Sequence, residues 1–225
     1  MDEMNRECIE RGLLVVISGP SASGKGTVNR YVLENEDFVY SVSATTRQPR
    51  AGEVDGVNYH FTTKENFERL IRENEVLEYT QYCENYYGTL RAPAEKVLSA
   101  GKNLILEIEV EGAAQIREKY PDAVFIMLLP PSFREQEARL RNRQSEDEET
   151  IQRRLRQTRR EMKCVALYDY IVYNRNGQAK EAAEEILAIV KAEKCSRRRI
   201  SDVARRYFEC GDRACDGDCF ACTEF

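Results

Sequence analysis

The sequence predicts an α/β protein of three layers, in which helices cover both faces of a parallel core sheet. Three observations lead to this prediction. Short apolar runs of the kind that form buried strands alternate with amphipathic helical segments along the chain. A polar, turn-rich segment after the second of these strands is typical of an inserted lobe. A strongly charged stretch in the second half is typical of a helical hairpin.

The first predicted strand covers residues 13–17, five apolar residues in a row. The small or turn-forming residues that follow it are Gly19, Pro20, Ser21, Ala22, Ser23 and Gly24. After Lys25 the pattern becomes helical, with Val28, Tyr31 and Val32 on one face. Small residues let backbone N–H groups converge on an anion, the helix N-terminus adds its positive dipole end, and the lysine adds a point charge. The segment therefore predicts a site for a nucleotide phosphate.

The loop also matches the P-loop motif, Gly-x4-Gly-Lys-[Ser/Thr]. Gly26 stands where the motif has Ser or Thr, and Thr27 follows one place later. The hydroxyl that ligates Mg²⁺ in such loops is therefore displaced, and either Thr27 or a water molecule would take its place. An ordinary strand-to-helix turn is the alternative interpretation, which the strand before the loop and the helix after it disfavour.

The inserted lobe is predicted at residues 43–88. Its first part is a polar segment rich in turn residues, and long loops of this kind in a compact domain are usually functional. Arg47 and Arg50 lie in this segment, and their guanidinium groups match phosphate oxygens bidentately. A helix is expected to begin after Thr63, its N-cap, and to run to about residue 74.

The other elements follow in the order that a parallel sheet requires. Strands are expected at residues 38–43, 76–82, 86–87, 103–110, 123–129 and 170–173. Helices are expected at residues 93–99, 113–119 and 179–193. Glu107 and Glu109 are two apart on one predicted strand, so their carboxylates should point to the same side of the edge where open α/β sheets bind ligands. They are candidates for holding Mg²⁺ through water, with solvated surface charge as the alternative.

The charged hairpin is predicted at residues 133–164, with a break at residues 142–145. Arg139 and Arg143 are four apart and share a helical face, and Arg154 lies on the second helix. Arginines on a mobile hairpin can neutralise charge as a phosphoryl group moves, and can exclude water from it. The hairpin carries many other arginines, so a solvated face is the alternative for each one alone.

Composition limits the class of protein. The chain has 225 residues, of which 42% are hydrophobic, enough for the core of one ordinary domain. A net charge of −5 gives no general attraction to nucleic acid or anionic membranes. No apolar run approaches the ~20 residues that span a bilayer, and the polar, acidic N-terminus is unlike a signal peptide, so a cytoplasmic protein is expected. His60, the only histidine, is interpreted as structural.

Residues 194–225 are predicted to be a separate, cysteine-rich extension with a helix at about residues 196–208. Four cysteines follow with four, three and two residues between successive members: Cys210, Cys215, Cys219 and Cys222. Four thiolates can hold Zn²⁺ in a reducing compartment, although only the final Cys-x-x-Cys has a typical spacing. A tail with free thiols and no metal is the alternative.

Together these segments resemble one known family, the guanylate kinases, from about residue 12 to residue 193. The motifs that carry the resemblance are Gly19–Lys25, Ser41–Glu53, Asn85–Gly88, Leu106–Gly112, Leu129–Ser132 and Tyr168–Asn174. The Ser41–Glu53 motif is far more specific to this family than the P-loop is. The resemblance implies a P-loop kinase fold with a core (12–42, 89–132, 165–193), a GMP-binding lobe (43–88) and a lid (about 133–164).

The resemblance also implies an activity, the transfer of the γ-phosphoryl group of MgATP to GMP. It implies catalytic roles for Lys25, Arg50, Arg143 and Arg154. It implies that ATP is bound by residues 19–27, Arg139 and Asn174, with Mg²⁺ held through water by Glu107. It implies that GMP is bound by Ser43, Arg47, Arg50, Tyr59, Glu78, Tyr87, Thr89 and Glu109. Glu78 would accept from guanine N1–H and the exocyclic amine, a donor pair that adenine lacks.

The chain departs from the family pattern at several positions. Ala22 replaces a usual loop glycine, at a small cost if its φ is negative. Glu107 and Glu109 stand where Asp is usual, so each carboxylate reaches one methylene further. Gln144 and Arg175 also differ from the residues common there. None of these changes removes a group that phosphoryl transfer requires.

Two other functions are kept beside the first, a catalytically silent interaction module of the same fold and a nucleoside monophosphate kinase with another acceptor. Such modules tend to lose the P-loop lysine and lid arginines, whereas this chain keeps Lys25, Arg143 and Arg154. Ser43 with Glu78 argues against another acceptor. No membrane or specific nucleic-acid partner is expected, and the sequence leaves the oligomeric state open.

Overall fold

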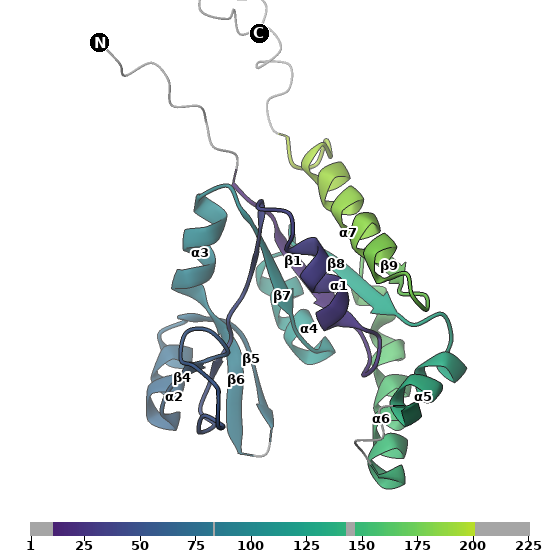
Figure 1. Cartoon of the computed structure of the whole chain (residues 1–225). Helices are drawn as coiled ribbons and strands as arrows, with labels where there is room; N and C mark the ends of the chain where they lie inside the picture. Colours follow the sequence, from purple (N-terminus) through teal and green to yellow (C-terminus); the bar gives the residue numbers. More distant parts are fainter. Residues whose placement is uncertain (1–10, 83, 143–146, 201–225) are drawn as a thin grey trace, which may run out of the picture. The chain divides into compact units, whose positions relative to one another are not determined.

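The computed structural model describes residues 11–82, 84–142 and 147–200 (Figure 1). The chain divides into two compact units, Met1–Val190 and Lys191–Phe225. The sheets, the phosphate loop and the charged hairpin described below all belong to the first unit. Within the described residues, no helix is both long and apolar enough to cross a membrane.

The core of the first unit is a five-stranded sheet in the order β2-β7-β1-β8-β9, in which every neighbouring pair is parallel. The strands are β1 (Leu14–Ser18), β2 (Phe38–Tyr40), β7 (Asn103–Glu107), β8 (Val124–Leu129) and β9 (Tyr170–Tyr173). All residues of β1 and β8 are buried, as continuous apolar runs predict for strands covered on both faces. The predicted parallel sheet is confirmed.

Helices cover both faces of this sheet (Figure 1). On one face α1 (Lys25–Val32) and α7 (Ala179–Lys194) bury residues such as Val28, Val32 and Ile186. On the other, α3 (Arg91–Ser99) and α4 (Val110–Lys119) bury Leu98 and Ile116. These two apolar clusters, one on each face of the sheet, give the three layers that the sequence predicts.

A second sheet forms the inserted lobe, with strands in the order β4-β3-β6-β5. Its elements are β3 (Ala44–Thr45), β4 (His60–Phe61), α2 (Lys64–Arg72), β5 (Val76–Tyr82) and β6 (Asn85–Leu90). Thr63 is the N-cap of α2, as predicted, and its hydroxyl accepts from the backbone N–H of Asn66 at 3.2 Å. Phe67 of α2 stacks on Tyr86 of β6 with 5.2 Å between ring centroids, which joins helix and sheet.

The charged hairpin consists of α5 (Phe133–Asn142) and α6 (Glu148–Glu161), followed by the 3-10 helix η1 (Met162–Leu167). Asp147 is the N-cap of α6, and its carboxylate accepts from the backbone N–H of Thr150 at 2.8 Å. The predicted break at residues 142–145 begins where α5 ends, and residues 143–146 lie outside the described part of the chain.

Two predicted strands were too long. The strand predicted at residues 103–110 ends at Glu107, and Glu109 is instead the N-cap of α4, which begins at Val110 rather than at residue 113. Glu107 and Glu109 therefore do not share a strand face. The strand predicted at residues 38–43 ends at Tyr40, because the chain leaves the core sheet there and pairs again as β3 in the lobe.

Candidate nucleotide-binding and phosphoryl-transfer site

The phosphate loop joins β1 to α1 and passes close to its neighbours. Gly24 has φ +92°, in the left-handed region, and a Cβ there would collide with the side-chain amide of Asn174. A Cβ at Gly19 would collide with the backbone carbonyl of Leu128 on β8. Both positions therefore require glycine. A Cβ at Gly26 would meet no atom within 4 Å, so this glycine is not imposed by space.

Lys25 begins α1, and its side chain folds back over the loop. Its ammonium group donates to the carbonyl oxygen of Gly19 at 2.5 Å, which holds the charge beside the loop backbone. Thr27 lies two residues further along α1 and is exposed. The cradle of small residues, lysine and helix N-terminus is thus present as the sequence predicts.

Ala22 does not have the conformation that would make it a neutral replacement for glycine. Its φ is +65°, in the left-handed region, so the condition for a small cost, a negative φ, is not met. An L-residue there brings its Cβ close to the following carbonyl, at a cost of roughly 1–2 kcal/mol. Ala22 is 7% exposed, so neighbouring residues cover it almost completely.

Two of the three predicted lid arginines contact the loop region directly. Arg154 of α6 donates to the hydroxyl of Ser21 at 2.9 Å. Arg139 of α5 donates to the backbone carbonyl of Asn174 at 2.8 Å, and the Asn174 amide in turn donates to the carbonyl of Ser23 at 2.8 Å. These residues are therefore not a solvated face. Arg143 lies outside the described residues.

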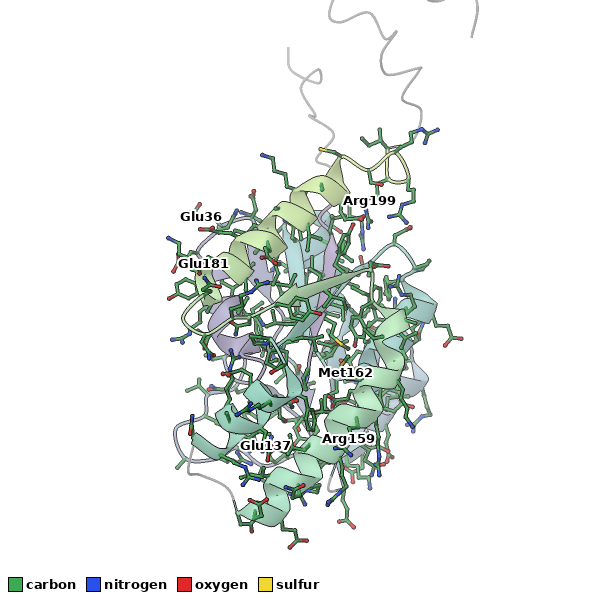
Figure 2. The ribbon with its side chains drawn as sticks, turned by 90° about the vertical axis from the view of Figure 1, so that its right-hand side faces the viewer. Glu36, Glu137, Arg159, Met162, Glu181 and Arg199 are labelled. Atoms are coloured by element: carbon green, nitrogen blue, oxygen red, sulfur yellow. The ribbon has the colours of Figure 1, made fainter. Side chains whose placement is uncertain are left out.

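On the outer side of the lid, side chains of the two helices contact each other rather than the phosphate loop. Figure 2 looks onto these helices and labels Glu137 of α5 and Arg159 of α6. The guanidinium carbon of Arg159 lies 5.3 Å from the centre of the Phe133 ring, which joins the two helices away from the loop. For Arg159, unlike Arg139 and Arg154, a surface role is therefore sufficient.

Glu107 lies next to the phosphate loop and is held in place from two sides. It is paired in register with Ile17, two residues before Gly19. One carboxylate oxygen accepts from the side-chain amide of Asn29 at 2.7 Å and from the hydroxyl of Tyr40 at 3.3 Å. Burial, with the charge of Glu107, raises the pKa of Tyr40, so its hydroxyl stays protonated and can donate.

This arrangement fits Mg²⁺ bound with ATP. Mg²⁺ usually keeps several waters and takes one or two carboxylates beside substrate phosphates, so a dedicated cage of protein ligands is not needed. No group of three or more His, Cys, Asp or Glu side chains that could hold a metal occurs in the described part of the chain. One oriented carboxylate beside the loop is sufficient for a water-mediated contact.

The lobe contains a buried carboxylate, Glu78 on β5, which is 3% exposed. The hydroxyl of Thr89, its partner across the β5–β6 ladder, donates to it at 2.8 Å. Strand β6 also pairs with β3, where Ala44 lies opposite Gly88, and Ser43 is the residue just before β3. Burial raises the pKa of Glu78, and the bond from Thr89 opposes this shift. The structure thus brings Glu78 and Thr89, two residues that the resemblance assigned to one base, into direct contact.

Gly112 is a site residue that the sequence did not single out. It lies in the first turn of α4, and a Cβ there would lie 2.6 Å from a carboxylate oxygen of Glu78. Any other residue would push this carboxylate away. Gly112 is the last residue of the Leu106–Gly112 motif, but only the packing of α4 against β5 shows that it leaves space for the Glu78 carboxylate.

The predicted phosphate clamp is organised by Glu53. Its carboxylate accepts from both terminal nitrogens of Arg47, at 2.9 and 3.0 Å, and from the backbone N–H of Arg50 at 2.7 Å. The hydrogen bond from Arg47 lowers the pKa of Glu53, so the acid stays charged. Arg47 also lies 5.5 Å from the centre of the Tyr59 ring.

Two tyrosines that the resemblance assigns to the clamp, Tyr59 and Tyr87, lie against each other. The Tyr59 and Tyr87 rings contact edge to face, with centroids 6.1 Å apart. Arg50 is exposed, so its guanidinium is available to solvent while its backbone is held by Glu53. The sequence motif contains Glu53, but the residue types alone did not reveal that it positions both arginines.

Glu161, at the end of α6, is a half-buried carboxylate that the sequence analysis did not single out. Burial raises its pKa, as do the charges of Glu109 and Glu111, against a hydrogen bond from Gln157 and the charge of Lys25. The Glu161 carboxylate therefore interacts electrostatically with both Lys25 of the phosphate loop and Glu109, the N-cap of α4. Glu109 itself is exposed at that helix start.

The fold and the loop define the class of protein. A strand that runs into a glycine-bounded loop, a lysine and a helix, with an arginine-bearing hairpin bonded to the loop, is the build of a P-loop kinase. Residues 11–193 match the family model described as guanylate kinase. The chain belongs to the guanylate kinase family.

Individual relatives agree with this assignment. The chain is 48% identical over 193 residues to a guanylate kinase of Clostridium perfringens (strain SM101), covering 85% of this chain and 88% of the relative. It is 44% identical over 203 residues to a guanylate kinase of Oceanobacillus iheyensis, covering 90% and 98%. The crystal structure of guanylate kinase from Anaplasma phagocytophilum superposes with a TM-score of 0.70 at 30% identity, covering 92% of this chain and 98% of that one.

Proposed function

We propose that the site described above transfers the γ-phosphoryl group of ATP to GMP through the residues named below. The chain is a guanylate kinase by family, and the observation that carries the assignment of residues is the bonding of lid arginines to the phosphate loop. That contact, between Arg154 and Ser21, joins a cradle for a donor phosphate to cations that can meet the transferring group.

On the donor side, the loop backbone and Lys25 would bind the ATP phosphates, while Arg139 and Asn174 lie at the loop edge where the rest of the nucleotide would extend. Mg²⁺ bound with ATP would neutralise phosphate charge, and Glu107 is oriented to hold its waters, with Thr27 as a second candidate. Arg154, with Arg143 as a proposed partner, would neutralise charge on the phosphoryl group in flight. The hairpin at residues 133–164 would exclude water as it closes.

On the acceptor side, the lobe at residues 43–88 would bind GMP. Arg50, Arg47, Tyr59 and Tyr87 would grip its phosphate. Glu78 would accept from guanine N1–H and the exocyclic amine, with Ser43 and Thr89 beside it, and Glu109 would lie near the acceptor at the start of α4. An ionised Glu78 is desolvated before GMP arrives, so its bonds to the guanine donors are made in a poorly screened environment.

The cysteines Cys210, Cys215, Cys219 and Cys222 lie outside the described residues. Zinc bound to these four thiolates stays a proposal that rests on the residue types and the reducing, cytoplasmic location expected from the sequence. Metal analysis of the purified chain tests it. One equivalent of zinc, lost in Cys219→Ser, supports the proposal, and a metal-free protein contradicts it.

The reaction is tested by ADP production with ATP, Mg²⁺ and one of GMP, AMP, UMP or dTMP. We expect turnover with GMP alone. Lys25→Ala should lower kcat by at least ~100-fold, since it removes a preorganised charge at the transferring phosphates. Arg50→Ala should mainly raise the KM for GMP. GMP binding without turnover for any acceptor would contradict the proposal and favour a silent binding module.

A further inference from the structure

The phosphate loop contains one alanine whose conformation needs an explanation. Ala22 has φ +65° and is 7% exposed. Non-glycine residues rarely adopt this backbone region, and they persist in it where surrounding contacts hold them. The surroundings of Ala22 therefore indicate what holds it there.

Ala22 packs into a small apolar cluster made by the lid. Its other members are Leu140 of α5 and Ile151 and Leu155 of α6, which are 2%, 5% and 5% exposed. The cluster is separate from the two apolar layers that cover the central sheet. Among the described residues, Ala22 is the one member of this cluster that does not belong to the lid helices.

Polar contacts surround this apolar one. The side-chain amide of Gln136 donates to the carbonyl of Ser21 at 3.0 Å and to the hydroxyl of Thr158 at 2.7 Å. Gln136 and Thr158 are 1% and 4% exposed, so both helices meet the loop through a dry interface. Arg154 donates to the Ser21 hydroxyl at the same place.

We propose that Ala22 is a positioning residue whose methyl group docks the lid onto the phosphate loop, and so places Arg139 and Arg154 at the donor phosphates. Glycine would suit the backbone at this position better, but it has no side chain to enter the cluster. The alanine accepts an unfavourable φ and gains an apolar contact with both lid helices. The effect on the arginines rests on the proposed function, whereas the docking contact does not.

The first test is Ala22→Gly, which should fold because glycine readily adopts φ +65°. Hydrogen exchange without ligands should become faster in residues 133–142 and 148–161 and stay unchanged in β1 and β8. The kcat/KM for ATP should fall about fivefold, which corresponds to ~1 kcal/mol at 1.36 kcal/mol per tenfold. The KM for GMP should not change. Lid exchange that stays as slow as in the parent protein would overturn the proposal.

The second test separates docking from general destabilisation by a double-mutant cycle with Leu155→Ala. The loss in lid protection caused by Leu155→Ala should be smaller in the Ala22→Gly background, because part of the contact is already gone. Equal effects in both backgrounds would overturn the proposal. Glu84→Gly is the matched control, since Glu84 also has a left-handed φ of +64° but is exposed in the lobe hairpin. It should leave lid exchange and kcat/KM for ATP unchanged.

The two readouts distinguish this proposal from the proposed reaction. A parent protein without kinase activity, in which Ala22→Gly still loosens the lid, would contradict the reaction and support the docking contact. Normal kinase activity in the parent protein, with lid exchange unaffected by Ala22→Gly, would support the reaction and contradict the docking contact.

Discussion

At the scale of single residues, the burial of Glu78 affects both the stability of the protein and its proposed binding of guanine. The residue is 3% exposed, and burial raises its pKa above the ordinary value of 4.5. Because the folded pKa lies above the unfolded one, the favourable contribution of this group is complete below about pH 4.5 and is lost as the pH rises through the folded pKa. The ionised acid therefore costs stability at neutral pH, where the proposed recognition of guanine needs it.

We accordingly predict that Glu78→Gln raises the midpoint of thermal unfolding at pH 8 and that the gain shrinks toward pH 4. The same change should raise the KM for GMP at least ~10-fold, because a hydrogen bond to a charged group contributes ~1.5–3 kcal/mol and the new amide donor faces the guanine donors. Calorimetry across this pH range and steady-state kinetics measure the two effects.

Glu118→Gln on the exposed side of α4 is the control for this experiment. This substitution should change neither the midpoint of thermal unfolding nor the KM for GMP. A Glu78→Gln protein that is less stable than the parent at pH 8 would show that the hydrogen bond from Thr89 outweighs the burial of charge.

At the scale of elements, α4 of the core is hydrogen-bonded to β5 of the lobe. Gln115 of α4 donates to the carbonyl of Tyr79 at 2.7 Å and accepts from its backbone N–H at 3.1 Å, so the side chain pairs with β5 as a neighbouring strand would. Lys119 of α4 donates to the carbonyl of Leu77 at 2.9 Å. The helix that begins at Glu109 thus holds the strand that carries Glu78.

We predict that Gln115→Leu lowers the free energy of unfolding by ~1–3 kcal/mol, because it leaves the backbone groups of Tyr79 without partners at a similar side-chain volume. It should raise the KM for GMP several-fold and leave the KM for ATP nearly unchanged. Chemical denaturation and kinetics test both expectations, with Glu118→Leu as the control. Equal changes in both KM values would argue against a local link to the acceptor lobe.

At the scale of the whole compact unit, these contacts connect the binding regions to one core. The lobe is bonded to α4, the lid to the phosphate loop, and α4 and the loop both adjoin the central sheet. We therefore expect the described unit to unfold in one cooperative transition, although the lobe has a sheet and a small core of its own.

It follows that GMP, whose proposed site is formed mainly by the lobe, should stabilise the entire unit. At 100 times its dissociation constant, the ligand should add ~2.7 kcal/mol to the free energy of unfolding. Differential scanning calorimetry should show a single transition that moves upward as a whole. A transition that splits on addition of GMP would mean that the lobe unfolds independently.

Elements that are stabilised by local interactions could be predicted from the sequence. The buried runs of β1 and β8 and the cap at Thr63 follow from apolar patterning and from a side chain that bonds a nearby backbone group. The phosphate loop was predictable because glycines and lysine at fixed spacing have one dominant use, and the motif at Ser41–Glu53 was specific enough to suggest the acceptor.

Features that depend on residues distant in sequence became apparent only from the folded chain. The end of β7 at Glu107, the left-handed φ of Ala22 and the space that Gly112 leaves for Glu78 are each set by a neighbouring element. Spacing could not separate Arg139 and Arg154 from the surface arginines of the same helices, because what distinguishes them is contact with the loop. Local patterns specify elements, whereas packing between elements specifies which side chains meet.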